Sequence, residues 1–188
     1  CRGGRTVSSM HLGRVDQVWR YPVKSLRGDR VPSAAVTERW GVPGDRGWAI
    51  RGEGGALLSA KQLPPLLLLH ARYPDEPRGG STPVVEITFP DGTAMRSDHG
   101  AINSALIPDV LQDTVPDAAI DQRRFRKNLI VDTGTDAARF PEFEWVGRRL
   151  RLGALVCEVV KPIPRCVMVG LPQDDQPHDR GILRSPAR

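Results

Sequence analysis

Short apolar stretches alternate with turns rich in glycine and proline along most of the chain, a pattern typical of β-strands. Residues 14–21 follow a loose period-two pattern that predicts a strand, and residues 84–89 predict a clear strand. Pro90-Asp91-Gly92 follows it and predicts a hairpin turn, because proline presets φ and glycine accepts a positive φ. Further strands are predicted at 31–36, 47–51 and 129–131, and a hairpin turning at Gly153 and Ala154 is predicted at 149–160.

Helical periodicity is weak by comparison. Residues 102–111 are the best helix candidate, although Pro108 interrupts them. Residues 74–83 predict a polar loop, and residues 173–188 carry so few apolar side chains that they predict a loop or a disordered tail. The pattern therefore predicts a mainly β fold of the α+β class, arranged as a barrel or a sandwich.

The length of 188 residues is enough for one full core or for two small subdomains. No run of about 18 apolar residues is present, so no membrane-spanning helix is predicted. The first 13 residues carry no apolar segment of the kind found in secretory signals, and Met10 is a candidate start. Three cysteines argue against a disulfide framework and favour a reduced, cytoplasmic location.

The net charge is +5, and arginine supplies most of the basic residues. Such an excess is compatible with nucleic-acid binding or with a solvated basic surface that has no partner. The arginines do not form one cluster and aromatic residues are sparse, which favours the second interpretation and disfavours a nucleic-acid partner.

Two segments in the first half offer groups that bind phosphate. Lys24 and Ser25 follow a predicted strand and place an ammonium beside a hydroxyl. Gly44 allows a turn at which Asp45 could orient Arg46 toward an anion. The alternative for each segment is an ordinary surface loop with a weak ion pair.

Residues 123–128 form a basic segment in the second half. On a strand, Arg124, Arg126 and Asn128 would share one face and suit a phosphate or the edge of a pterin. The alternative is a basic edge strand that prevents aggregation.

Cys166 is the candidate metal ligand. Arg165 beside it and Lys161 nearby would favour the thiolate, which is a soft ligand for a metal. Cys157 lies in an apolar strand and is predicted to be buried in the core, which is also the alternative for any single cysteine. The four histidines are scattered and no CxxC or HExxH motif is present, so zinc is not expected.

In this order, the segments resemble the MOSC family, the molybdenum cofactor sulfurase C-terminal domain proteins, including members such as the mitochondrial amidoxime-reducing component. The resemblance implies a small β-rich MOSC N-terminal domain at 12–98 and a MOSC β-barrel at 99–188. The chain is shorter than the family pattern between Ser97 and Asp121 and after Leu183. The matching segments are 18–25, 44–46, 58–64, 124–131, 144–147 and 165–166.

The resemblance also implies roles for individual residues toward a molybdenum–molybdopterin cofactor. Cys166 would ligate the molybdenum. The other implied cofactor residues are Lys24, Ser25 and Arg46 at the phosphate, Arg126 and Asn128 elsewhere on the cofactor, and Arg165 beside the metal ligand.

The implied activity is reduction of small N-hydroxylated compounds, with electrons from a separate flavin or iron–sulfur partner. The family also carries a general association with pyridoxal phosphate binding. The alternatives are a carrier of the cofactor or of sulfur without turnover, an inactive fragment, and a basic β-rich nucleic-acid-binding domain.

Overall fold

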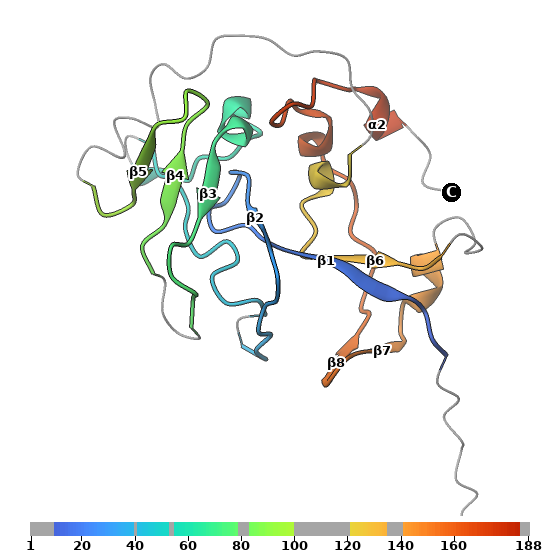
Figure 1. Ribbon diagram of the computed structural model, residues 1–188. Coiled ribbons are helices and arrows are strands. Elements are labelled where there is room, and N and C mark those ends of the chain that lie inside the picture. The colour runs from blue at the N-terminus through green and yellow to red at the C-terminus, as the bar shows by residue number, and fades with distance from the viewer. Residues whose placement is uncertain are drawn as a thin grey trace, which may run out of the picture. The chain divides into compact units, whose positions relative to one another are not determined.

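The computed structural model describes residues 10–39, 41–52, 55–78, 83–99, 121–134 and 141–184. It consists mostly of strands with a few short helices, so the predicted mainly β fold is confirmed (Figure 1). The strands are β1 (Arg14–Arg20), β2 (Asp29–Val31), β3 (His70–Arg72), β4 (Glu86–Thr88), β5 (Ala94–Arg96), β6 (Leu129–Asp132), β7 (Arg149–Leu152) and β8 (Leu155–Glu158). The helices are η2 (Pro64–Leu68), η3 (Gln122–Phe125), η4 (Pro141–Trp145), η5 (Val167–Gly170) and α2 (Gly181–Arg184), of which only α2 is not 3₁₀.

The chain divides into two compact units. The first holds Cys1–Asp16 and Leu129–Pro162, and the second holds Gln17–Asn128 and Ile163–Arg188. The predicted domain boundaries, 12–98 and 99–188, stay a prediction. No helix in the described part of the chain is long and apolar enough to cross a bilayer.

Two antiparallel arrangements organise the second unit. β1 pairs with β2, with Val18 opposite Val31 and Trp19 opposite Arg30. β3, β4 and β5 lie side by side as a second sheet, with Ile87 opposite both Ala71 and Met95 (Figure 1). The predicted turn between β4 and β5 is confirmed, since Gly92 adopts φ +86° there.

The core of the described residues lies in the second unit. The two prolines at the start of η2 cost no helical hydrogen bond, because the first N–H groups of a helix have no intrahelical partner. η2 then buries Leu66 and Leu67 almost completely, against Leu26 and Val85 among others. The apolar run at 63–69 is therefore core.

The first unit contains the predicted hairpin. β7 and β8 pair with Leu150 opposite Cys157 and turn at Gly153, where φ is +63°. In residues 10–16, 129–134 and 142–162 of this unit, every side chain is at least partly exposed to solvent. Cys157 is accordingly only half-buried, so its predicted burial in the core is wrong.

Several predicted elements differ from the structure. The strand predicted at 31–36 is β2, which ends at Val31 because Pro32 follows. Residues 47–51 form single bridges instead of a strand. The helix predicted at 102–111 lies outside the described residues.

The described part of the predicted loop or disordered tail is folded. Gln173 and Gln176 pair with each other through their backbones and are both about 95% buried. Ile182 on α2 is 2% exposed. Residues 173–180 contain neither strand nor helix, so the predicted loop is confirmed there. The burial of Gln173 and Gln176 was not predicted because polar side chains dominate this segment, and amide groups can be buried when their backbone is paired.

Gly28 allows close backbone contact at the start of β2. A β-carbon on Gly28 would lie 2.0 Å from the carbonyl oxygen of Arg20. We expect Gly28→Ala to lower the free energy of unfolding by about 2–3 kcal/mol or more, measured by urea denaturation. Gly52→Ala is the control, because its β-carbon would meet Leu58 only at 3.4 Å, and an equal loss in both variants would contradict the steric explanation.

Candidate functional site

The structure places the two predicted phosphate-binding segments side by side. The N–H of Arg46 donates to the carbonyl of Tyr21 at 2.6 Å, and the N–H of Trp48 donates to that of Pro22 at 3.0 Å. The N–H of Lys24 returns to the carbonyl of Trp48 at 2.9 Å. This short ladder joins the segment after β1 to the turn that carries Arg46.

Asp45 orients Arg46, as predicted. Its carboxylate pairs with the Arg46 guanidinium, and its other oxygen accepts the N–H of Tyr21 at 2.9 Å. Gly44, at φ +77°, makes the preceding turn possible. Arg46 Nη2 also donates to the carbonyl of Arg126 at 3.1 Å, so the two predicted cofactor arginines meet.

Both arginines contact the same aromatic ring, and we call Tyr21, Arg46 and Arg126 the Tyr21 cluster. The Cζ atom of Arg126 lies 4.4 Å from the centre of the Tyr21 ring, and that of Arg46 lies 5.4 Å from it. Tyr21 is 3% exposed. A buried ring face attracts guanidinium groups and fixes their positions.

The cluster holds its positive charges at an energetic cost. Burial, with the nearby charge of Arg46, lowers the pKa of Arg126 to about 10. Burial and then Arg46 also lower the pKa of Lys127. Each lowered pKa means that the charged form is disfavoured there. A bound anion would offset both the burial and the mutual repulsion.

Other predicted cofactor residues have structural partners. Ser25 adopts φ +72°, is 3% exposed, and accepts the N–H of Ala60 on its hydroxyl at 3.0 Å. Asn128 Nδ2 donates to the carbonyl of Trp19 at 3.1 Å. Lys24 is exposed. Their roles toward a cofactor stay predictions.

Cys166 lies exposed at the start of η5, where it is the N-cap residue. Its carbonyl accepts the N–H of Val169 at 3.2 Å. Arg165 beside it donates to the carbonyl of Ile182 at 3.0 Å, which ties this segment to α2.

The predicted strand at 123–128 is largely wrong, because residues 122–125 form η3 and Arg126 caps it at φ +51°. A 3₁₀ turn with a left-handed cap does not alternate its side chains as a strand does. Arg124 therefore contacts the carbonyls of Val169, Leu171 and Pro177, whereas Arg126 contacts Tyr21 and the carbonyl of Leu26.

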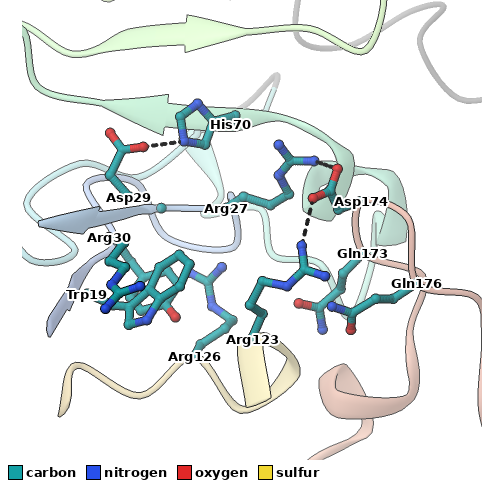
Figure 2. A pocket seen from close by; sticks show the side chains of 12 residues that line it. Trp19, Arg27, Asp29, Arg30, His70, Arg123, Arg126, Gln173, Asp174 and Gln176 are labelled. Carbon is teal, nitrogen blue, oxygen red and sulfur yellow. Dashed lines mark hydrogen bonds and ion pairs between the residues drawn. The ribbon is translucent and has the colours of Figure 1, made fainter. Parts of the chain in front are cut away.

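A cavity of about 370 Å³ in the second unit is partly lined by the Tyr21 cluster (Figure 2). Trp19 stacks beside Tyr21 there, with ring centres 6.4 Å apart and an 18° interplanar angle. The volume of the cavity is at the lower end for small-molecule sites, and its lining of aromatic rings and charged side chains is suited to a small polar ligand. The ion pairs drawn around it are Asp29 with His70 at 2.6 Å, Arg27 with Asp174, and Arg123 with Asp174 at 3.0 Å.

The sequence did not predict that Arg27, Asp29, His70 and Gln176 line this cavity. Arg27, Asp29 and His70 belong to no recognisable motif, and pairing between segments brings them together. Gln176 lies in the polar segment 173–188, which carries no motif that marks it. In the structure its side-chain oxygen is buried and has no hydrogen-bond partner among the described residues. Nor do three or more His, Cys, Asp or Glu side chains gather as a metal site in the ranges that the structure covers.

The comparisons with known proteins identify the class. Residues 12–115 match the MOSC N-terminal beta barrel domain, and residues 99–186 match the MOSC domain. The chain therefore belongs to the MOSC family, as its motifs predicted.

Three relatives are amidoxime reducing components. The chain is 35% identical over 78 residues to mitochondrial amidoxime reducing component 2 of Bos taurus, which covers 40% of this chain and 23% of that protein. It is 37% identical over 68 residues to mitochondrial amidoxime-reducing component 1 of Mus musculus, covering 35% and 20%. It is 38% identical over 61 residues to mitochondrial amidoxime reducing component 2 of Rattus norvegicus, covering 31% and 18%.

Each of these matches spans less than a quarter of the relative's length. No solved structure gives a significant match to the chain. The relatives are named as mitochondrial proteins, and the cytoplasmic location expected for this chain stays a prediction.

Asp121 caps η3 by accepting the N–H of Arg123 on its side chain, and it also pairs with the Arg123 guanidinium. These hydrogen bonds from Arg123 lower the pKa of Asp121, against the effect of burial. A lowered folded pKa stabilises the protein above the unfolded value of about 3.9, and this contribution is lost as pH falls through the folded value.

We therefore expect Asp121→Asn to reduce the free energy of unfolding at pH 7, and the difference from wild type to shrink below about pH 4. Urea denaturation between pH 7 and pH 3 measures both. A difference that is independent of pH would mean that the carboxylate charge of Asp121 does not stabilise η3.

Proposed function

We propose that the chain binds the molybdenum–pterin cofactor and acts as an oxidoreductase on small N-hydroxylated compounds. The observation that supports this most is the Tyr21 cluster, where the guanidinium groups of Arg46 and Arg126 lie against one ring and the charge of Arg46 also acts on Lys127. Asp45 pairs with Arg46. A phosphate would relieve the repulsion among these basic groups and accept charge-assisted hydrogen bonds.

The cofactor phosphate would lie at Arg46, with Lys24 and Ser25 on the adjoining segment. Ser25 already accepts one hydrogen bond, but its hydroxyl proton remains able to donate. Arg126 and Asn128 would hold another part of the cofactor. Two contacts fix Arg126 for this purpose, one to the ring of Tyr21 and one to the carbonyl of Leu26.

Cys166 would supply the protein ligand of the metal. Its side chain is exposed, so a ligand can reach its sulfur, and a thiolate is a soft donor suited to such a centre. Arg165 would flank it. When bound, the cofactor supplies a metal that cycles between oxidation states and takes an oxygen atom from the substrate.

The N-hydroxylated substrate class is supported by the names of the relatives, which are amidoxime reducing components. Reduction of an amidoxime to an amidine and water consumes two electrons and two protons. The electrons would come from a separate flavin or iron–sulfur protein. Pyridoxal phosphate binding stays a prediction from the family.

Molybdenum content tests the proposal directly. In protein purified from a host that makes the cofactor, we expect near-stoichiometric molybdenum in wild type, little in Cys166→Ala, and wild-type levels in Cys157→Ala. Cys157 is the matched control because it lies in the first unit and is half-buried. Equal retention in both variants, or no metal in wild type, would overturn the assignment. Metal without reduction of benzamidoxime by an artificial donor would indicate a carrier.

Anion binding is measurable without the cofactor. We expect Arg46→Gln to weaken pyrophosphate binding about tenfold or more in calorimetry, because a hydrogen bond to a charged group contributes about 1.5–3 kcal/mol. Arg51→Gln is the control, since Arg51 donates to the carbonyl of Gly55 on an exposed turn. Equal affinities would show that the Tyr21 cluster binds no anion through Arg46.

A further inference from the structure

We infer that Arg124 is a positioning residue that holds the Cys166 segment against η3. This inference deepens the proposed function and rests on it for the role of the thiolate. Arg124 is not among the cofactor residues that the family resemblance implies, and the structure turns it away from Arg126 toward residues 169–177.

The burial of Arg124 is unusual for a charged side chain. Arg124 is 1% exposed, and no carboxylate forms an ion pair with it among the described residues. Its Nε is buried and has no hydrogen-bond partner in the part of the chain that the structure describes, and burial lowers the pKa of Arg124. A buried charge of this kind is expensive, so an apolar side chain of similar size would often be tolerated equally well for stability alone.

Among the described residues, the side-chain hydrogen bonds of Arg124 go to one segment of the chain, 169–177. Nη1 donates to the carbonyls of Val169 and Leu171 at 3.3 and 3.1 Å, and Nη2 donates to that of Pro177 at 2.6 Å. A planar guanidinium has fixed donor directions, so it holds three carbonyls in a defined arrangement. Lysine offers a single ammonium and cannot reproduce this geometry.

This contact reaches Cys166 through η5. Val169, whose carbonyl Arg124 holds, donates its own N–H to the carbonyl of Cys166 at 3.2 Å. The next residue, Gly170, packs so closely that a β-carbon would lie 2.7 Å from the carbonyl of Asp179, and the N–H of Asp179 donates to the carbonyl of Gly170 at 2.9 Å. Arg124 and the backbone of Asp179 therefore both hold η5 in place, and Cys166 is the N-cap residue of η5.

η3, which carries Arg124, also connects to the Tyr21 cluster. Arg126 follows Arg124 by two residues, and it contacts Tyr21 and the carbonyl of Leu26. Asp121 caps η3 and so fixes its start. η3 thus connects Arg126, a proposed cofactor contact, to the segment that carries the thiol, and all of these residues lie in the second unit.

Arg124→Met separates positioning from simple packing, because methionine retains an unbranched chain but donates no hydrogen bond. We expect the amides of Val169, Leu171 and Asp179 to exchange hydrogen about tenfold faster in this variant, because each 1.4 kcal/mol of lost restraint is a factor of ten. Amides of Ala71 and Ile87 in the core should be unchanged. Arg72→Met is the control, since Arg72 is a half-exposed arginine paired with Glu86.

The second readout is a split between two ligands. We expect Arg124→Met to lose most of its molybdenum when produced in a cofactor-making host, while its pyrophosphate affinity stays within about twofold of wild type. Arg124→Lys should show the same split, because it restores charge without the planar fork. Should Arg124→Met fail to fold, Arg124→Lys decides the question by the same two measurements.

Unchanged exchange at 166–179, or wild-type molybdenum in both variants, would overturn the inference. Parallel loss of metal and pyrophosphate binding would also overturn it, because it would indicate collapse of the whole site. The two proposals fail differently: a wild type without molybdenum would reject the cofactor assignment, while hydrogen exchange of the metal-free chain would still test whether Arg124 holds the Cys166 segment.

Discussion

The contact between the buried guanidinium of Arg126 and the ring of Tyr21 is the interaction on which the candidate site depends. The guanidinium packs on the ring of Tyr21 and donates to the carbonyl of Leu26, while Arg46 donates to the backbone carbonyl of Arg126. Three segments distant in sequence thereby meet around one charge. Such a charge lacks the hydration it would have in water, and the ring and the carbonyl offset part of that loss.

η3 extends this constraint toward the candidate metal ligand. Its left-handed cap at Arg126 turns one arginine to Tyr21, while Arg124 contacts the carbonyls that follow Cys166. A continued strand would have sent both side chains to one face, away from one of these partners. The geometry of a single turn is therefore what links a cationic surface to a thiol in the second unit.

The fold supports the site by placing it against the core of the second unit. Val23 and Leu26, which flank Lys24 and Ser25, are both almost fully buried. Ser25 ties this turn to Ala60 and so prevents the segment from moving as a free loop. The local rigidity of the predicted phosphate-binding segments thus comes from apolar burial and from backbone pairing with residues 46–48.

The sequence by itself determined the mainly β class, the hairpins at Gly92 and Gly153, the MOSC family and the pairing of Asp45 with Arg46, because each rests on local turn chemistry or on ordered motifs. Only the tertiary structure decided that residues 122–125 form η3 and that Arg124 and Arg126 contact different partners. It also decided that the polar tail is partly buried and that Gln176 lines a cavity with Arg27 and His70. The physical reason is that buried polar groups are stabilised by distant backbone partners, and no local pattern of apolar residues records where those partners lie.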